Sequence, residues 1–182
     1  MKILVSANFY IYLAILLLIL PIQWLIAWIT AVCFHEICHY VAVKICGGEN
    51  YNLTLEFGGA VLSCSEMSTP KHIFSLLAGP IGGFLLVLLG RWFPHLALCS
   101  WVLSLYNLLP LQPLDGGQAL RLMIWKEYTF QIIEKTILII LTFGCICLSI
   151  RWHLGILPII IVSMLWMKNR NSPCKEQVCR VK

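Results

Sequence analysis

Long apolar runs constrain the fold of this chain more than any other feature of its sequence. They cover residues 3–20, 22–46, 72–90 and 132–167, with few charged side chains inside them. A helix needs about 20 apolar residues to cross the hydrocarbon core of a bilayer. The chain is 60% hydrophobic and only 12% charged, with a mean hydropathy of +0.87. An ordinary soluble domain is about 25% charged. The sequence therefore predicts an integral membrane protein embedded in the lipid bilayer.

The number and length of these runs predict an all-α polytopic membrane protein with about six transmembrane helices. The predicted spans are residues 3–20, 22–46, 72–90 and 96–109, with spans 5 and 6 both inside residues 132–167. The last run is too long for one crossing, and Gly155 and Pro158 mark its reversal. We also expect a short interfacial helix over residues 118–125. The first run could be a signal peptide, but no small-residue cleavage site follows it, so we expect a retained span.

The domain organisation follows from this count of spans. We expect a single transmembrane domain over residues 1–167 and a basic cytoplasmic tail over residues 168–182, with no separate soluble domain. Most of the nine cysteines lie in apolar runs, where Cys behaves as a small hydrophobic residue. In the tail, Cys174 and Cys179 could pair with each other, bind a metal or stay unlinked, and the sequence does not decide among these states.

Residues 51–64 differ from the apolar runs on either side of them. Polar and apolar side chains alternate from Asn52 to Phe57, Gly58 and Gly59 follow, and a second short run ends at Cys64. Alternation with a period of two is typical of a strand, and paired glycines are typical of a hairpin turn. The sequence predicts a small β-hairpin at the membrane surface after the second span, and a plain loop is the alternative.

The distribution of Lys and Arg predicts the orientation of the chain. With the N-terminus in the cytoplasm, six spans place every Lys and Arg inside except Arg91 and Arg151. Cytoplasmic loops of membrane proteins carry such an excess of positive charge. We therefore expect a multi-pass protein of the cell membrane with both termini in the cytoplasm. The same rule accounts for the net charge of +5, so no nucleic-acid partner is expected.

The second predicted span contains His35, Glu36 and His39 inside an otherwise apolar run. Residues four apart lie on one face of a helix, so the two histidines can share one metal ion, with Glu36 beside it. This H-E-x-x-H spacing supplies two zinc ligands and a general base for a water molecule. The five-residue pattern alone is weak evidence. Its position is stronger evidence, because a charged side chain at membrane depth is costly and indicates a functional site.

A third ligand is expected because a catalytic zinc usually binds three protein side chains and keeps one position open. Asp115 is the only aspartate in the chain, and it lies in a segment whose prolines and glycines break the helix at membrane depth. In the six-span topology, both histidines and Asp115 fall near the cytoplasmic ends of their spans. Each residue alone has an ordinary explanation, a packed histidine or a capping aspartate. Together they favour one metal site, which other divalent ions could also fill.

These residues resemble the site-2 protease family of intramembrane zinc metalloproteases. The family pairs an H-E-x-x-H on one membrane helix with a later N-x-x-P-x-x-x-L-D-G, and this sequence has both motifs in that order. The second motif is matched in full by Asn107, Pro110, Leu114, Asp115 and Gly116. The small residues 78–80 resemble the family's third conserved helix, although helix packing is the simpler interpretation of them. Many members carry Asn where this chain has Gly83. The likeness covers roughly residues 24–120, and in size the chain is most similar to the bacterial branch that processes sporulation sigma-factor precursors.

The resemblance implies a role for each matched residue. His35, His39 and Asp115 would bind one Zn²⁺ ion, and Glu36 would activate a water molecule and later protonate the leaving amine. Asn107 would orient or stabilise the reacting carbonyl. The implied reaction hydrolyses a peptide bond in or near a transmembrane segment of a partner membrane protein. Since a helical substrate must first unwind, we expect the edge at residues 53–57 to pair with it by strand addition.

Two other functions are consistent with part of the sequence. A non-catalytic zinc-binding membrane protein could keep the same fold, but the presence of Glu36 and of a third ligand argues against it. A carrier of metal ions would be expected to show internal repeats or polar residues along a whole pathway. The sequence shows neither, because its intramembrane polar groups cluster at one depth. The predicted function is therefore that of a zinc metalloprotease.

Overall fold

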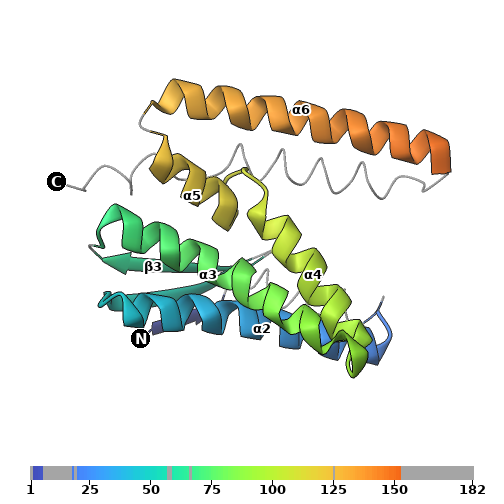
Figure 1. Ribbon diagram of the computed structural model, residues 1–182, viewed down its shortest axis with the longest axis horizontal. Helices are drawn as coiled ribbons and strands as arrows, with labels where there is room; N and C mark the ends of the chain where they lie inside the picture. The colour runs from blue at the N-terminus through green and yellow to red at the C-terminus, as the bar shows by residue number, and fades with distance from the viewer. Residues whose placement is uncertain are drawn as a thin grey trace. The chain divides into compact units, whose positions relative to one another are not determined.

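The computed structural model describes residues 2–5, 18, 20–56, 59–65, 67–124 and 126–152. The chain forms two compact units, Met1–Tyr106 and Asn107–Lys182. The described elements follow in the order β1, α2, β2, β3, α3, η1, α4, α5 and α6 (Figure 1). The predicted sixth span, the tail with Cys174 and Cys179, and most of the predicted first span lie outside the described residues.

Helix α2, Ile22–Ile45, forms where the sequence predicts the second span. Its end is closed by two backbone hydrogen bonds, from Gly47 N–H to the Lys44 carbonyl and from Gly48 N–H to the Val43 carbonyl, each 3.1 Å long. Gly47 has a φ of 76°, which is the left-handed conformation that this type of helix end requires. The glycine pair therefore ends the helix two turns after His39, as the sequence predicts.

Helix α3, Thr69–Val87, continues into the 3₁₀ turn η1, Leu88–Arg91. Ser68 is the N-cap residue and Pro70 lies in the first turn, but the Ser68 side chain makes no capping hydrogen bond. Pro80 lies inside the helix and is buried. Because proline has no backbone N–H, it removes one hydrogen bond of the helix at this point.

Helix α4, Pro94–Leu108, has 15 residues and is too short to cross a bilayer as a straight helix. It packs against α2 through a small apolar core, made by buried residues of the two helices: Ala27, Ala31, Cys99 and Leu103. Helix α2 also lies beside α3 (Figure 1). Small side chains at these contacts allow the helices of the first unit to approach closely.

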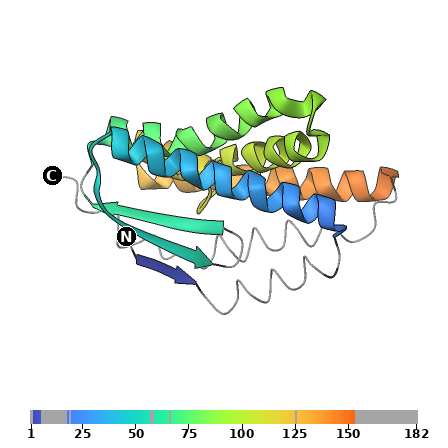
Figure 2. The same cartoon turned by 90° about the horizontal axis from the view of Figure 1, so that it is seen from below.

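A three-stranded sheet accompanies these helices, with strands β1, Lys2–Val5, β2, Glu49–Glu56, and β3, Gly59–Ser65. The strand order is β1-β2-β3, so β2 is the central strand (Figure 2). β2 and β3 are antiparallel, with Glu56 opposite Gly59, in the segment where the sequence predicts a hairpin. β1 is parallel to β2, with Lys2 opposite Asn52.

Two sequence predictions change in this region. The first span does not begin at residue 3, because Lys2–Val5 is a strand. A short apolar run does not distinguish a strand from a helix, and pairing with β2 satisfies the backbone groups of these residues. In addition, residues 53–56 are not an exposed edge, since β2 is paired on both sides. Among the described strands, β1 and β3 form the two edges of the sheet.

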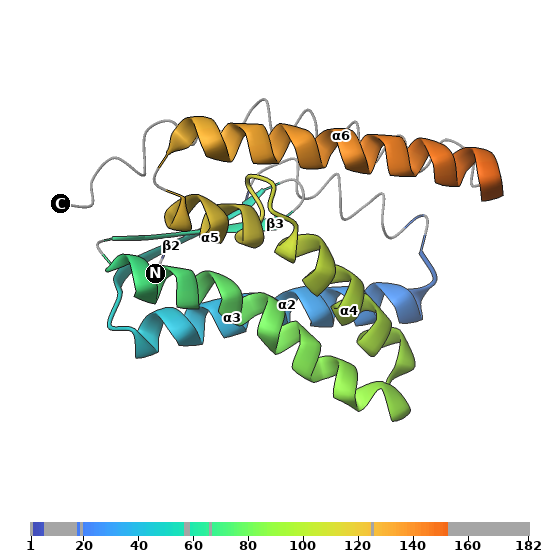
Figure 3. The same cartoon turned by 45° about the horizontal axis from the view of Figure 1, so that its top comes forward.

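The second unit contains α5, Asp115–Met123, and α6, Glu127–Trp152, which follow one another with a short connection (Figure 3). The sequence predicts the short helix at residues 118–125, but it begins three residues earlier, at Asp115. Leu114 is extended and precedes the first turn, where an acidic residue is favoured by the helix dipole. The glycines at residues 116 and 117 are therefore part of α5 rather than of the loop.

Among the described residues, three helices are long and apolar enough to cross a membrane: Ile22–Ile45, Thr69–Arg91 and Glu127–Cys147. Several large apolar side chains of α2 and α6 are exposed on the protein surface, including Ile26, Val41, Ile139, Ile140 and Phe143. Such an apolar surface suits contact with lipid rather than with water. The chain is therefore a helical membrane protein, and the total of six spans stays a prediction.

Candidate metal centre

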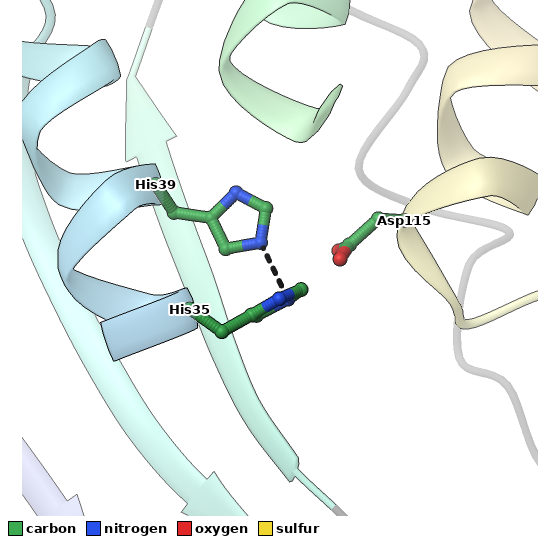
Figure 4. A group of neighbouring side chains, drawn as sticks. All are labelled: His35, His39 and Asp115. Atoms are coloured by element: carbon green, nitrogen blue, oxygen red, sulfur yellow. Dashed lines mark hydrogen bonds between the residues drawn. The ribbon is translucent and has the colours of Figure 1, made fainter. Parts of the chain in front are cut away.

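His35 and His39 lie on one face of α2, as their spacing predicts. Their Nε2 atoms are 3.1 Å apart, and both side chains are buried (Figure 4). Two nitrogen ligands of a tetrahedral zinc ion lie roughly 3.3 Å apart, since each Zn–N bond is about 2.0–2.1 Å long. The two imidazoles therefore have the spacing that one zinc ion requires of two of its ligands.

The backbone carbonyl of Ser75, on α3, determines the orientation of His39. His39 Nδ1 donates a hydrogen bond to this oxygen at 2.7 Å, and Ser75 is itself buried. A carbonyl can only accept a hydrogen bond, so Nδ1 carries the proton and Nε2 keeps its lone pair. Metal-binding histidines commonly hold their second nitrogen in this way. His39 is therefore oriented to bind a metal through Nε2.

Gly79, one turn further along α3, leaves a space beside both imidazoles. A Cβ atom at this position would overlap His39 Nε2 and would lie only 2.8 Å from His35 Nε2. Any residue other than glycine would therefore displace the imidazoles or push α2 and α3 apart. The nitrogen donors and their separation fit a zinc ion.

Glu36 follows His35 directly, so it lies about 100° further around α2. Its side chain is half-buried. The Glu36 carboxyl group is therefore near the face of α2 that carries the two histidines, but it does not lie on that face. This is the placement that a general base requires when the histidines bind the metal.

Asp115 and Asn107 belong to the second unit, whereas both histidines belong to the first. Asp115 is the first residue of α5, and Asn107 lies in the last turn of α4; both side chains are half-buried. Figure 4 draws Asp115 with the two histidines. The N-cap residue of α5 is Leu114, and Asp115 lies in the first turn of this helix. Within one unit, the structure thus brings together His35 and His39.

Sequence reasoning missed the contributions of Ser75 and Gly79. The sequence interpretation assigns the small residues of α3 to helix packing alone. Ser75 acts through its backbone carbonyl, which no residue type reveals, and Gly79 is one of three glycines within five residues. One signal was available: Gly79 precedes Pro80 in a helix that packs against the helix of the two histidines. A glycine at such a contact indicates close approach.

Two named relatives share sequence with this chain, and no protein-family model matches it. The chain is 31% identical to a protein of Synechocystis named "Putative zinc metalloprotease sll0528", over 85% of this chain and 50% of the relative. It is 33% identical to Rip3 of Mycobacterium tuberculosis, which bears the same description, over 52% of this chain and 29% of the relative. The chain thus spans half or less of the length of these relatives.

The fold is similar to that of a solved structure, the site-2 protease from Methanocaldococcus jannaschii. The TM-score is 0.66 at 20% sequence identity, and the likeness covers 99% of this chain and 93% of that one. At this identity, the likeness establishes the fold. The chain is thus similar in sequence to named zinc metalloproteases and has the fold of a site-2 protease.

Proposed function

We propose that this chain is an intramembrane zinc metalloprotease that hydrolyses a peptide bond in or near a transmembrane segment of a partner membrane protein. The observation that carries the proposal is the His35–His39 pair, with Nε2 atoms 3.1 Å apart, on a helix that is long and apolar enough to cross a membrane. Buried ionisable groups at this depth are costly and are retained for function. The names of the two relatives support the choice of zinc and of protease chemistry.

Asp115 is the proposed third ligand of a single zinc ion. It is the only aspartate of the chain, it occupies the first turn of α5, and it ends the matched N-x-x-P-x-x-x-L-D-G motif with Gly116. Two histidines and one carboxylate form a common ligand set of catalytic zinc, which leaves a fourth position for water or substrate. A chain with only the two histidines would bind zinc more weakly.

The proposed mechanism divides the work between the metal and the side chains around it. A zinc ion held by His35, His39 and Asp115 would lower the pKa of a water molecule to about 7 and would polarise the scissile carbonyl. Glu36 takes a proton from the attacking water and passes it to the leaving amine nitrogen. The Asn107 side chain donates a hydrogen bond to the carbonyl oxygen as negative charge develops on it. Ser75 holds His39 in the metal-binding tautomer throughout.

The substrate is proposed to enter as an extended strand, because a helix hides its backbone from attack. An extended segment can add to the edge of a sheet through main-chain hydrogen bonds. In this sheet, β2 is central and β1 and β3 are the edges, and we assign the docking edge to β3, Gly59–Ser65, the second strand of the predicted hairpin. The sequence prediction of residues 53–57 as that edge is replaced by this assignment.

We also propose the multi-pass topology with six spans and both termini in the cytoplasm. The near absence of Lys and Arg from the predicted outer loops supports this orientation. In this topology the metal centre lies near the cytoplasmic face of the membrane. The partner is then a membrane protein whose cleavage would release a product toward the cytoplasm.

The test is cleavage of candidate membrane-protein substrates co-expressed with the parent chain or with its Glu36→Gln variant. The control is Glu127→Gln, which removes an exposed carboxylate of α6. Zinc content of each purified protein is measured in parallel. We expect cleavage by the parent and by Glu127→Gln, no cleavage by Glu36→Gln, and equal zinc in all three.

Two results would reject the proposal. Equal cleavage with Glu36→Gln would show that another protease is responsible. Absence of zinc from the folded parent after incubation with excess metal would remove the proposed cofactor. Zinc binding in all variants without cleavage of any substrate would favour the non-catalytic zinc-binding alternative.

A further inference from the structure

Residues 109–114 connect α4 to Asp115, and we call them the site loop. Two of its six residues, Pro110 and Pro113, have no backbone N–H, and three others, Leu111, Gln112 and Leu114, are buried. Irregular backbone that is buried in a membrane protein must satisfy its polar groups inside the protein. The position of Asp115 therefore depends on the contacts that hold the site loop.

Glu134, on α6, provides one of these contacts. The backbone N–H of Gln112 donates a hydrogen bond to Glu134 Oε1 at 2.7 Å. Both residues are buried, with exposed fractions of 7% for Gln112 and 8% for Glu134. The N–H groups of Leu111 and Leu114 donate to carbonyls within the site loop itself. Gln112 is thus the residue that joins this loop to α6, while Gln118 of α5 donates to the Pro113 carbonyl at 2.9 Å.

The burial of Glu134 is costly and needs a compensating contact. The residue lies inside Glu127–Cys147, one of the helices long and apolar enough to cross a membrane. Its neighbour Lys135 is exposed, so α6 directs the carboxyl group inward while the adjacent charge remains outside. A carboxyl group kept inside such a helix indicates a functional constraint. The hydrogen bond to Gln112 shows that this carboxyl group holds the site loop.

Arg121 adds a second, more exposed connection to the same loop. Its Nη1 atom donates to Gln112 Oε1 at 3.4 Å, and its Nη2 atom is 3.2 Å from Glu127 Oε2. The side chain of Glu127 is 56% exposed, and an ion pair at such a surface contributes little to stability. Glu127 and Glu134 are thus two carboxylates on one helix, one exposed and one buried against the site loop.

The other end of the loop is fixed by close packing. A Cβ atom at Gly116 would overlap the backbone carbonyl of Leu108, so the first turn of α5 lies directly against the end of α4. Asp115 lies between this contact and the Gln112–Glu134 hydrogen bond. Movement of the loop at Gln112 would therefore change the direction in which the Asp115 side chain leaves α5.

We propose that Glu134 is a positioning residue for the metal centre, which fixes Gln112 and the site loop so that Asp115 is held in its zinc-binding orientation. The inference rests on the proposed function, because it assumes that Asp115 is the third ligand. Glu134 acts through Gln112 and Asp115 and does not bind the metal itself. Partners that orient metal ligands in this way commonly contribute roughly 10–100-fold to metal affinity.

The experiment measures zinc affinity of the full chain in detergent by competition with a chelator, for three variants and the parent. Glu134→Leu removes the acceptor of the Gln112 hydrogen bond, Glu134→Gln keeps an Oε1 acceptor, and Lys135→Gln, at the exposed neighbour of Glu134, is the control. We expect Glu134→Leu to lower zinc affinity roughly 10–100-fold. Glu134→Gln should stay within a few-fold of the parent, and Lys135→Gln should equal the parent.

A second measurement separates positioning of Asp115 from a general effect on the fold. In the Asp115→Ala background the third ligand is already absent, so Glu134→Leu should cause little further loss of zinc affinity. The visible absorption spectrum of the Co²⁺-substituted protein provides an independent readout. We expect Glu134→Leu to change this spectrum in the same direction as Asp115→Ala.

Each outcome decides the inference. A parent that binds no zinc would reject the proposed function. Parent-like affinity of Glu134→Leu, or an equal loss with and without Asp115, would overturn the positioning role while the proposed function stands. If Glu134→Leu does not fold, Glu134→Asp, which shortens the side chain by one carbon, takes its place with the same expectation. Failure of both to fold would assign Glu134 to overall stability and overturn the proposal.

Discussion

His39 donates a hydrogen bond from Nδ1 to the backbone carbonyl of Ser75 at 2.7 Å. This contact joins a side chain of α2 to the main chain of α3, so the orientation of the imidazole depends on how closely the two helices approach. Gly79 lies one turn beyond Ser75, where a side chain would overlap His39 Nε2. The two residues of α3 therefore act together, one by accepting the hydrogen bond and one by leaving space.

Gly79→Ala is expected to weaken zinc binding. The added methyl group would occupy the space beside the two Nε2 atoms and would force α2 and α3 apart. Overpacking of this kind typically costs about 1–3 kcal/mol in stability. The measurements are the zinc content of the purified variant, its zinc affinity by chelator competition and its thermal unfolding in detergent.

Gly144→Ala is the matched control for this variant. A Cβ atom at Gly144 would meet no described heavy atom within 4 Å, and alanine favours a helix over glycine by about 1 kcal/mol. We expect parent-like zinc affinity and unchanged or slightly higher stability. Equal zinc affinity in Gly79→Ala, Gly144→Ala and the parent would show that the close packing of α3 against the histidines is not needed for metal binding.

Replacing His39 with alanine should abolish high-affinity zinc binding, because it removes one ligand and the hydrogen bond that joins this ligand to Ser75 of α3. His95→Ala is the control, since His95 packs edge-on against Trp24 with ring centroids 4.6 Å apart and is outside the H-E-x-x-H motif. Zinc per protein, measured by elemental analysis after gel filtration, should fall only for His39→Ala. Stoichiometric zinc in that variant would contradict the assignment.

Much of the first unit could be predicted from sequence because its signals are local. The long apolar run, the glycine pair after it and the spacing of His35 and His39 each depend on neighbouring residues in one helix. These signals gave α2 correctly to within one residue at its end. They also gave the shared direction of the two imidazoles, which follows from helix geometry alone.

The features that sequence missed depend on contacts between distant segments. Lys2–Val5 is a strand because β2 is available to pair with it, and nothing within the apolar run itself reveals that partner. The Ser75 carbonyl carries no residue-type signal. Glu134 lies seven residues after the start of α6 and belongs to no sequence motif. Only the fold shows that it contacts Gln112.

Removal of zinc by a chelator should lower the thermal stability of the parent. A ligand that binds only the folded state stabilises it by about 4 kcal/mol when its free concentration is 1,000 times its Kd. The decrease should be reversed by added zinc and should be absent from His39→Ala, which has no bound metal to lose. The measurement is thermal unfolding with and without chelator. A parent protein that is insensitive to chelation would contradict a tightly bound zinc.

Proline substitutions along β3 should test the proposed docking edge. Successive residues of a strand direct their N–H groups alternately toward β2 and away from it, so Ala60→Pro, Val61→Pro and Leu62→Pro sample both directions. A proline that removes an outward N–H should slow substrate cleavage and leave zinc binding unchanged, because the pairing with β2 is kept. A proline that removes an inward N–H should disturb the sheet itself and lower stability. Parent-like cleavage by all three variants, each folded and zinc-bound, would exclude strand addition at β3.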